Sequence, residues 1–195
     1  MSKHLKLSAK AIKAYAKKES VAGASEVLLY GVVGLDFNLA TVLAETKGLA
    51  AGAVLRIHSP GGDAHEGLAI YEALKGRGFI VRIDGLAASA ASLIAMAGTR
   101  IVMAPGAQLM LHNPWTMAEG DGNDLRAVAD VLDKIRDSYV DVYVARTGLA
   151  KEKVMEVMDS ETFWSAAEVA ALGFGEVAKS EQARALALAV AALAE

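Results

Sequence analysis

Short apolar segments alternate with helical stretches along most of this chain. The segments Val27–Val33, Ala53–His58 and Phe79–Ile83 are brief and mostly apolar, as buried strands are. The stretches between them carry apolar residues at three- and four-residue spacing, which is typical of helices. We therefore predict an α/β fold with largely parallel strand pairing, because parallel strands need the long crossovers that helices supply.

The remaining elements follow the same pattern. Two further short strands are predicted at 100–103 and 108–112, and helices at 38–48, 64–75, 88–97, 124–146, 149–158 and 165–173. The helix at 124–146 has the clearest amphipathic stripe. We divide the chain into a basic arm at 1–25, one domain at 26–179 and a helical, Ala/Leu-rich tail at 180–195.

Composition excludes several classes of protein and site. Lys plus Arg number 20 against 23 Asp plus Glu, which does not suit binding of nucleic acid through bulk charge. The chain has no cysteine, so disulfides, thiolate metal sites and a cysteine nucleophile are excluded. Its four histidines have no metal-ligand spacing, and we predict no metal.

The longest apolar run, Ala185–Ala194, is shorter than the roughly 20 residues of a membrane span. With no signal-peptide pattern either, we expect no membrane association and a cytoplasmic location.

A glycine-rich segment, Ser59-Pro60-Gly61-Gly62-Asp63, is predicted as the turn between a strand and a helix. Two glycines allow sharp backbone conformations and leave N–H groups facing outwards. The adjoining helix N-terminus would favour an anion or a developing oxyanion. The structural alternative is a simple glycine turn.

Ser89 lies in the segment Gly85–Ser92, where a predicted strand meets a helix of small residues. A serine at a helix N-terminus with small neighbours is a candidate nucleophile. The alternative is a helix N-cap with no chemical role. Ser92 lies three residues further along the same helix face, and we expect it to pack or to bond back to the helix, so it would serve as a control.

His112 ends the predicted strand at 108–112, directly before Asn113-Pro114. A histidine there can act as a general base only if a nucleophile lies within hydrogen-bond distance. Otherwise it is a structural residue at a strand end.

These three segments, in this order, resemble the ClpP family of serine peptidases. The resemblance lies in His58–Gly62, Gly85–Ala90 and Met110–Pro114, and it extends from about Val27 to Val177. Ile83–Ser92, His112–Trp115 and Glu161–Ala166 are most similar to the ClpP-like proteases encoded among phage and prophage head genes. The resemblance implies a ClpP/crotonase-like fold of repeated ββα units, with 124–146 as a protruding, handle-like helix.

The resemblance also implies roles for individual residues. Ser89 corresponds to the nucleophile and His112 to the general base of a peptidase that uses neither metal nor organic cofactor. The backbone N–H groups of Gly62 and Ala90 correspond to the oxyanion hole.

The third catalytic residue is where this chain departs from the family. The family has an aspartate two residues before a Phe-x-Ser-Ala segment, and here that position holds Glu161. Asp159 is the alternative acid. We favour Glu161 because it keeps the register with the predicted capping box that begins at Ser165.

For partners, the resemblance implies a polypeptide substrate and a homo-oligomeric ring. Among the phage relatives the substrate would be a capsid scaffold or portal-associated protein cut during head maturation, in the host cytoplasm. The lysine-rich arm at 1–25 lacks the family's N-terminal loop sequence, so we predict an ATP-independent endopeptidase with no unfoldase partner.

Three alternatives stay open. A crotonase-type acyl-CoA enzyme would share the backbone and the oxyanion hole without needing a Ser/His pair. A Ser/Lys dyad would have to use Lys134, the nearest lysine after Ser89. A non-catalytic assembly or scaffold protein would keep the fold but would not react with a fluorophosphonate probe.

Overall fold

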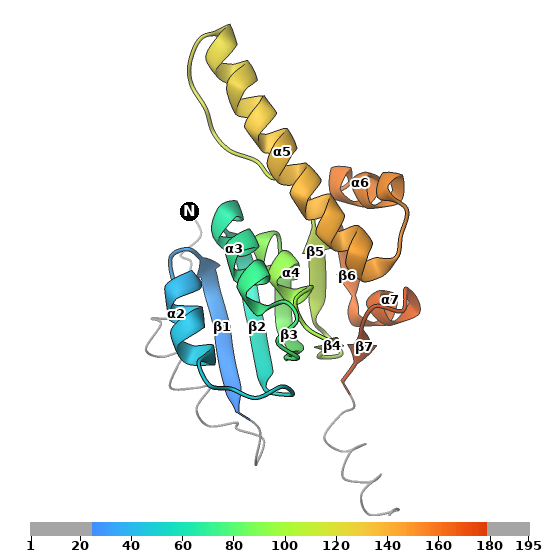
Figure 1. The fold of residues 1–195 in the computed structure, drawn as a ribbon. Helices are drawn as coiled ribbons and strands as arrows, with labels where there is room; N and C mark the ends of the chain where they lie inside the picture. The colour runs from blue at the N-terminus through green and yellow to red at the C-terminus, as the bar shows by residue number, and fades with distance from the viewer. Residues whose placement is uncertain (1–24, 179–195) are drawn as a thin grey trace, which may run out of the picture.

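A computed structural model describes residues 25–178. In this part of the chain a single sheet carries helices on one face, and one long helix projects beyond the rest of the molecule (Figure 1). The predicted basic arm, but for its last residue, and the predicted Ala/Leu-rich tail lie outside the described residues, so the domain division stays a prediction.

The elements alternate between strand and helix over the first half of the chain. In order they are β1 (Glu26–Val33), α2 (Leu39–Thr46), β2 (Val54–Gly62), α3 (Ala64–Leu74), β3 (Ile80–Ala88), α4 (Ala90–Ala95), β4 (Arg100–Met103), β5 (Gln108–Leu111), α5 (Gly122–Thr147), α6 (Lys151–Asp159), β6 (Thr162–Ser165), α7 (Ala166–Ala171) and β7 (Glu176–Val177). None of the helices in residues 25–178 combines the length and the apolar character that crossing a membrane requires.

The sheet confirms the predicted α/β class. Its main order is β1-β2-β3-β4-β7, and every pair along this path is parallel. The long strand β3 has two partners on one side, because its first half pairs with β4 and its last residues pair with β5. Strand β6 then adds to β5 in the antiparallel sense. The end of β3 therefore lies directly beside β5.

Two predicted turns are in fact strand. Strand β2 continues through the glycine-rich segment to Gly62, and β3 continues through Gly85 to Ala88. Gly61 and Gly62 have φ values of 96° and 151° but stay paired with Val32 and Val33 after a shift of register, so they produce an irregular strand rather than a reversal. Gly85 leaves room for a neighbour, since a Cβ there would lie 2.8 Å from Nδ1 of His58. As a result α4 begins at residue 90 instead of 88.

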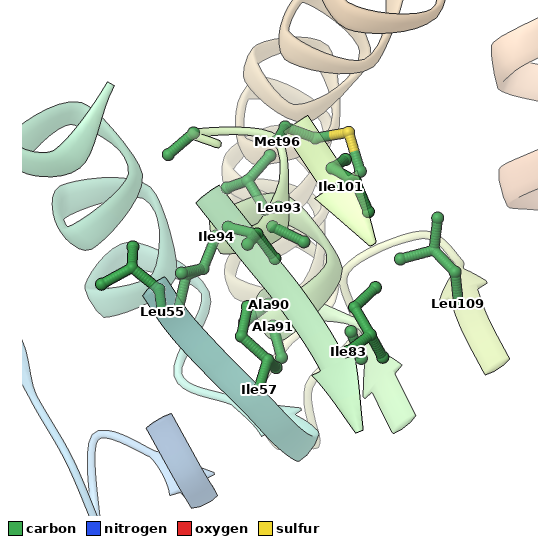
Figure 2. Close-up of a cluster of buried hydrophobic side chains, with 14 of the residues drawn as sticks. Leu55, Ile57, Ile83, Ala90, Ala91, Leu93, Ile94, Met96, Ile101 and Leu109 are labelled. Atoms are coloured by element: carbon green, nitrogen blue, oxygen red, sulfur yellow. The ribbon is translucent and has the colours of Figure 1, made fainter. Parts of the chain in front are cut away.

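Helix α4 is buried in the centre of the molecule, where it packs on the sheet (Figure 2). Its Leu93 and Ile94 belong to the same buried cluster as Leu55, Ile57 and Ile83, and all five side chains are fully buried. Apolar burial of this kind is the main source of folding free energy. The first residues of α4 are alanines, which allow α3 to approach closely. A fixed α4 in turn fixes the residue that precedes it, Ser89.

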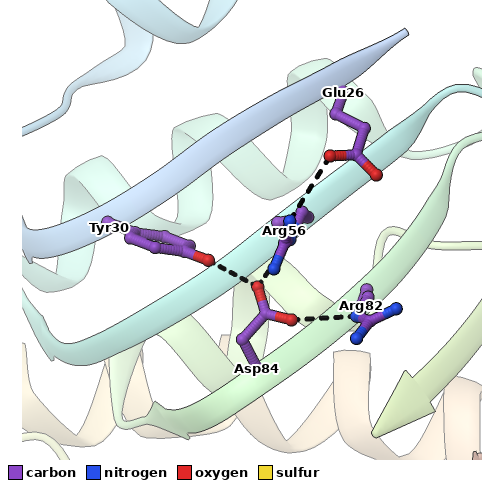
Figure 3. Close-up of polar contacts among 5 residues, drawn as sticks. All are labelled: Glu26, Tyr30, Arg56, Arg82 and Asp84. Carbon is purple, nitrogen blue, oxygen red and sulfur yellow. Dashed lines mark hydrogen bonds and ion pairs between the residues drawn. The ribbon is translucent and has the colours of Figure 1, made fainter. Parts of the chain in front are cut away.

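The opposite face of the sheet carries a charged network (Figure 3). Side chains alternate along a strand, so Arg56 and Asp84 lie opposite the face that holds Ile57 and Ile83. Arg56 Nε donates to the Asp84 carboxylate at 2.7 Å, and Tyr30 donates to the same oxygen. Burial alone would raise the pKa of Asp84, but the hydrogen bonds from Arg56 and Tyr30 outweigh it and lower that pKa. The network joins β1, β2 and β3 while leaving no buried charge unpaired within it.

The predicted long helix is confirmed as α5, a helix of 26 residues. Its last turns are buried through Tyr139, Val140 and Tyr143, whereas its first half extends away from the sheet (Figure 1). The predicted capping box at Ser165 is also confirmed, with Glu168 as the reciprocal partner. The short strands β6 and β7 were not predicted.

The approach of α3 to α4 can be tested at Gly67. A Cβ on this residue would lie 2.8 Å from Cβ of Ala90, which is too close without movement of a helix. A glycine-to-alanine change in a helix ordinarily stabilises by roughly 0.5–1 kcal/mol, but here overpacking should lower the free energy of unfolding by about 1–2 kcal/mol. Urea unfolding of Gly67→Ala measures this.

Gly122→Ala is the matched control for that substitution. Gly122 also lies in a helix, and the atom nearest to its added Cβ is the end of the flexible Arg126 side chain at 3.4 Å. Gly122→Ala should therefore be as stable as the parent chain or slightly more stable. Equal stabilities of Gly67→Ala and Gly122→Ala would contradict the close packing of α3 on α4.

Candidate active site

Ser89 occupies a strained turn between β3 and α4. Its φ of 54° and ψ of −128° lie in a region that side-chain-bearing residues avoid, at a cost of about 1–3 kcal/mol. Surrounding hydrogen bonds hold it there. The N–H of Ser89 donates to the carbonyl of Met110 on β5 at 3.0 Å, and its own carbonyl accepts from the N–H of Ser92 at 2.9 Å.

The Ser89 hydroxyl lies 2.8 Å from Nε2 of His112. The contact arises from the topology, because the end of β3 pairs with β5 and His112 follows β5 directly. Ser89 does stand at the N-cap position of α4, but its side chain makes no capping hydrogen bond. Ser89 is thus an N-cap by position without side-chain capping, and its hydroxyl instead faces His112.

His112 is half-buried, and its environment favours the neutral ring. Burial lowers the pKa of His112, the nearby Glu161 carboxylate opposes this effect, and the net result is a pKa below the ordinary value. A neutral imidazole can accept the Ser89 proton only when Nε2 is unprotonated and Nδ1 carries the hydrogen.

Gly61 and Gly62 bring the end of β2 against the serine turn. A Cβ on Gly61 would lie 2.6 Å from Cβ of Ser89 and 3.1 Å from the nitrogen of Ala90, so only glycine allows this approach. Ala90 is the first residue of α4, where the helix itself offers its N–H no acceptor. The two predicted oxyanion donors, Gly62 and Ala90, thus belong to backbone segments that lie side by side next to Ser89.

The two candidate acids differ in their surroundings. Glu161 lines the same cleft as Ser89 and His112, and its charge raises the pKa of His112 against the effect of burial. Asp159 instead accepts a hydrogen bond from Nδ2 of Asn113 at 2.7 Å. Within residues 25–178, no hydrogen bond joins Glu161 to His112. The Glu161 backbone has a positive φ of 47°, which is uncommon for a residue with a side chain.

The cleft in front of Ser89 has a volume of about 820 Å³ and one mainly apolar wall. That wall is the middle of α5, contributed by Ala127, Val128, Val131, Leu132, Ile135 and Tyr139. Trp115, 70 % exposed, lies at the cleft in the segment that leads into α5. The amphipathic stripe at 124–146 was visible in the sequence, but nothing there showed that half of it faces the candidate site.

Ser92 bonds back to the helix as predicted, since its hydroxyl donates to the Ser89 carbonyl at 2.6 Å. It also lies 2.8 Å from the hydroxyl of Tyr143 on α5, a contact that the sequence did not predict. A residue that touches the backbone of Ser89 is not a neutral control for substitutions of Ser89.

Comparison of the sequence with known proteins points to the same kind of site. The model of the family described as Clp protease matches residues 40–180. An ATP-dependent Clp protease proteolytic subunit of Arabis hirsuta is 38% identical over 128 residues, which is 61% of this chain and 63% of that protein. Chloroplastic ATP-dependent Clp protease proteolytic subunit 1 of Arabidopsis thaliana is 37% identical with the same coverage.

The family match takes in all of the described fold after residue 39. The alignment spans a little under two thirds of the length of these relatives, 63%. The family match covers well over half of the chain and includes the serine turn, the end of β5 and the acidic candidates. This chain belongs to the Clp protease family.

Proposed function

We propose that the chain is a serine endopeptidase in which Ser89 attacks the peptide bond and His112 is the general base. The 2.8 Å contact between the Ser89 hydroxyl and Nε2 of His112 carries this proposal. The strained Ser89 backbone supports it, because such strain is concentrated at functional sites. Family membership supports the same chemistry.

The proposed reaction proceeds through an acyl-enzyme. Ser89 Oγ bonds to the carbonyl carbon while His112 takes the hydroxyl proton, and the carbonyl oxygen becomes an oxyanion. The N–H groups of Gly62 and Ala90 stabilise that oxyanion, each worth about 2.7–4 kcal/mol in the transition state. His112 then gives its proton to the leaving amine, and water releases the acyl group by the same steps.

Glu161 is our proposed third member of the triad. Its place in the cleft and its effect on the pKa of His112 suit a carboxylate that stabilises the imidazolium. Asp159 is the weaker candidate, because its carboxylate is engaged by Asn113.

The proposed substrate is an extended, flexible polypeptide, and the proposed assembly is a homo-oligomeric ring that works without ATP. The relatives named above are subunits of ATP-dependent proteases. Cleavage of casein by this chain without ATP or an ATPase would therefore distinguish it from those relatives. Processing of capsid scaffold or portal-associated proteins in phage head maturation is the finer form of the proposal. It rests on the sequence resemblance alone.

The paired Ser89 and His112 favour a peptidase over a crotonase-type acyl-CoA enzyme, which needs no such pair. A Ser/Lys dyad through Lys134 is disfavoured because His112 already occupies the serine hydroxyl. A non-catalytic scaffold protein has no need of a strained serine beside a histidine.

Removal of the nucleophile should abolish activity. Ser89→Ala should lower casein cleavage by at least about 10⁴-fold and should prevent labelling by a fluorophosphonate probe. Ser138→Ala is the matched control, because among residues 25–178 the Ser138 hydroxyl bonds only to the Lys134 carbonyl on its own helix. Labelling of Ser89→Ala at the wild-type rate would contradict the assignment, and failure of wild type to react would favour the scaffold alternative.

The labelling rate should rise with pH as His112 loses its proton. Because burial lowers the pKa of His112, we expect the midpoint below the ordinary value of about 6.5, with a plateau at neutral pH. The second-order rate constant for fluorophosphonate labelling between pH 4.5 and 8.5 measures this. A flat profile, or a midpoint above 7, would argue against His112 as the base.

The two acids can be separated by the same profile. Glu161→Gln removes a charge that raises the pKa of His112, so the midpoint should move to still lower pH. The plateau rate should fall about 10²-fold, less than the roughly 10⁴-fold known for a triad acid that is hydrogen-bonded to its histidine. Asp159→Asn is the matched control and should change neither value. The reverse pattern would identify Asp159 as the triad acid.

A further inference from the structure

A buried chain of hydroxyl groups links α5 to the carbonyl of Ser89. Ser92 on α4 and Tyr143 on α5 are both fully buried. The Ser92 hydroxyl lies 2.6 Å from the Ser89 carbonyl oxygen and 2.8 Å from the Tyr143 hydroxyl. Neither side chain reaches the cleft, so the proposed chemistry leaves this chain of hydrogen bonds without a role.

The direction of the hydrogen bonds follows from the groups involved. A carbonyl oxygen can only accept, so Ser92 must donate its single proton to Ser89. Tyr143 must then donate to the oxygen of Ser92. Burial raises the pKa of the Tyr143 phenol, which therefore keeps its proton. The order is Tyr143 to Ser92 to the Ser89 carbonyl, with each hydroxyl used once as a donor.

The carbonyl at the end of this chain belongs to the peptide group that contains the Ala90 N–H. A trans peptide is planar, and its C=O and N–H point in opposite directions. Any group that fixes the direction of the Ser89 carbonyl therefore also fixes the direction of the Ala90 N–H. That N–H is one of the two proposed oxyanion donors, and its value depends on where it points.

Helix α5 is also hydrogen-bonded to the backbone that follows Gly62. Tyr139, one turn before Tyr143, donates to the Ala64 carbonyl at 2.9 Å. The two tyrosine rings meet edge to face at 6.2 Å. Ala64 lies two residues beyond Gly62, which carries the other proposed donor, so α5 contacts both backbone segments.

We propose that Tyr143 and Ser92 are positioning residues that orient the Ala90 N–H toward the oxyanion, which makes α5 part of the catalytic framework. This inference rests on the proposed peptidase function. The carbonyl of Ser89 also accepts from the N–H of Ser92 at 2.9 Å and of Leu93 at 3.4 Å, so loss of the hydroxyl chain should loosen the turn without undoing it.

The test is the rate of fluorophosphonate labelling, divided by the folded fraction from near-ultraviolet circular dichroism. Loss of an oxyanion donor costs about 10²–10³-fold, so Tyr143→Phe and Ser92→Ala, which only misorient one, should each cost about tenfold. The double variant should be no slower than the slower single variant, because both changes break one chain. The midpoint of the pH profile should stay at the wild-type value, since His112 is untouched.

Tyr71→Phe on α3 is the matched control and should label at the wild-type rate. Wild-type rates in both Tyr143→Phe and Ser92→Ala would overturn the inference, as would multiplied losses in the double variant or a shifted pH midpoint. If Tyr143→Phe does not fold, Ser92→Ala removes the terminal hydrogen bond of the same chain and decides alone. An unreactive wild type would instead overturn the proposed function, and this inference with it.

Discussion

The positive φ of Ser89 is the constraint on which the rest of the site depends. A residue with a side chain adopts this conformation only where its neighbours hold it. Here β5 accepts the N–H of Ser89, and α4 donates to its carbonyl. The side chain is left free of capping and meets His112 at the end of β5. One strained residue thus requires β3, α4 and β5 to lie where they do.

Close packing around that turn depends on the absence of side chains as much as on their presence. Gly61 admits the end of β2 to the turn, and Gly67 admits α3 to α4 at Ala90. Behind them, the apolar side chains of α4 anchor the helix in the sheet (Figure 2). The charged network around Asp84 joins three strands on the other face (Figure 3). The core and the site are therefore one packing arrangement, with α5 as its outer wall.

Periodicity predicted the α/β class and the long helix, because it is a local signal. The pairing of Ser89 with His112 was implied only by the resemblance of three segments to the ClpP family. The sequence prediction was wrong at three glycines. Gly61, Gly62 and Gly85 were predicted as turn residues, a common position for glycine. In the fold they lie within strands and allow segments that are distant in the sequence to approach closely. The link from Ser92 to Tyr143 spans 51 positions, and no local pattern marks it. Register alone does not show which carboxylate faces a histidine, so the sequence offered both Glu161 and Asp159 as the third acid; the cleft position of Glu161 comes from the fold.

We propose that the Ser89 turn presents both a nucleophile and an oxyanion hole. A crystal structure of the adduct formed with a fluorophosphonate tests it most directly, because the phosphoryl oxygen takes the place of the oxyanion. We expect a bond from Ser89 Oγ to phosphorus and a phosphoryl oxygen within hydrogen-bond distance of the nitrogens of both Ala90 and Gly62. An adduct on another residue, or a phosphoryl oxygen directed away from these two nitrogens, would contradict it.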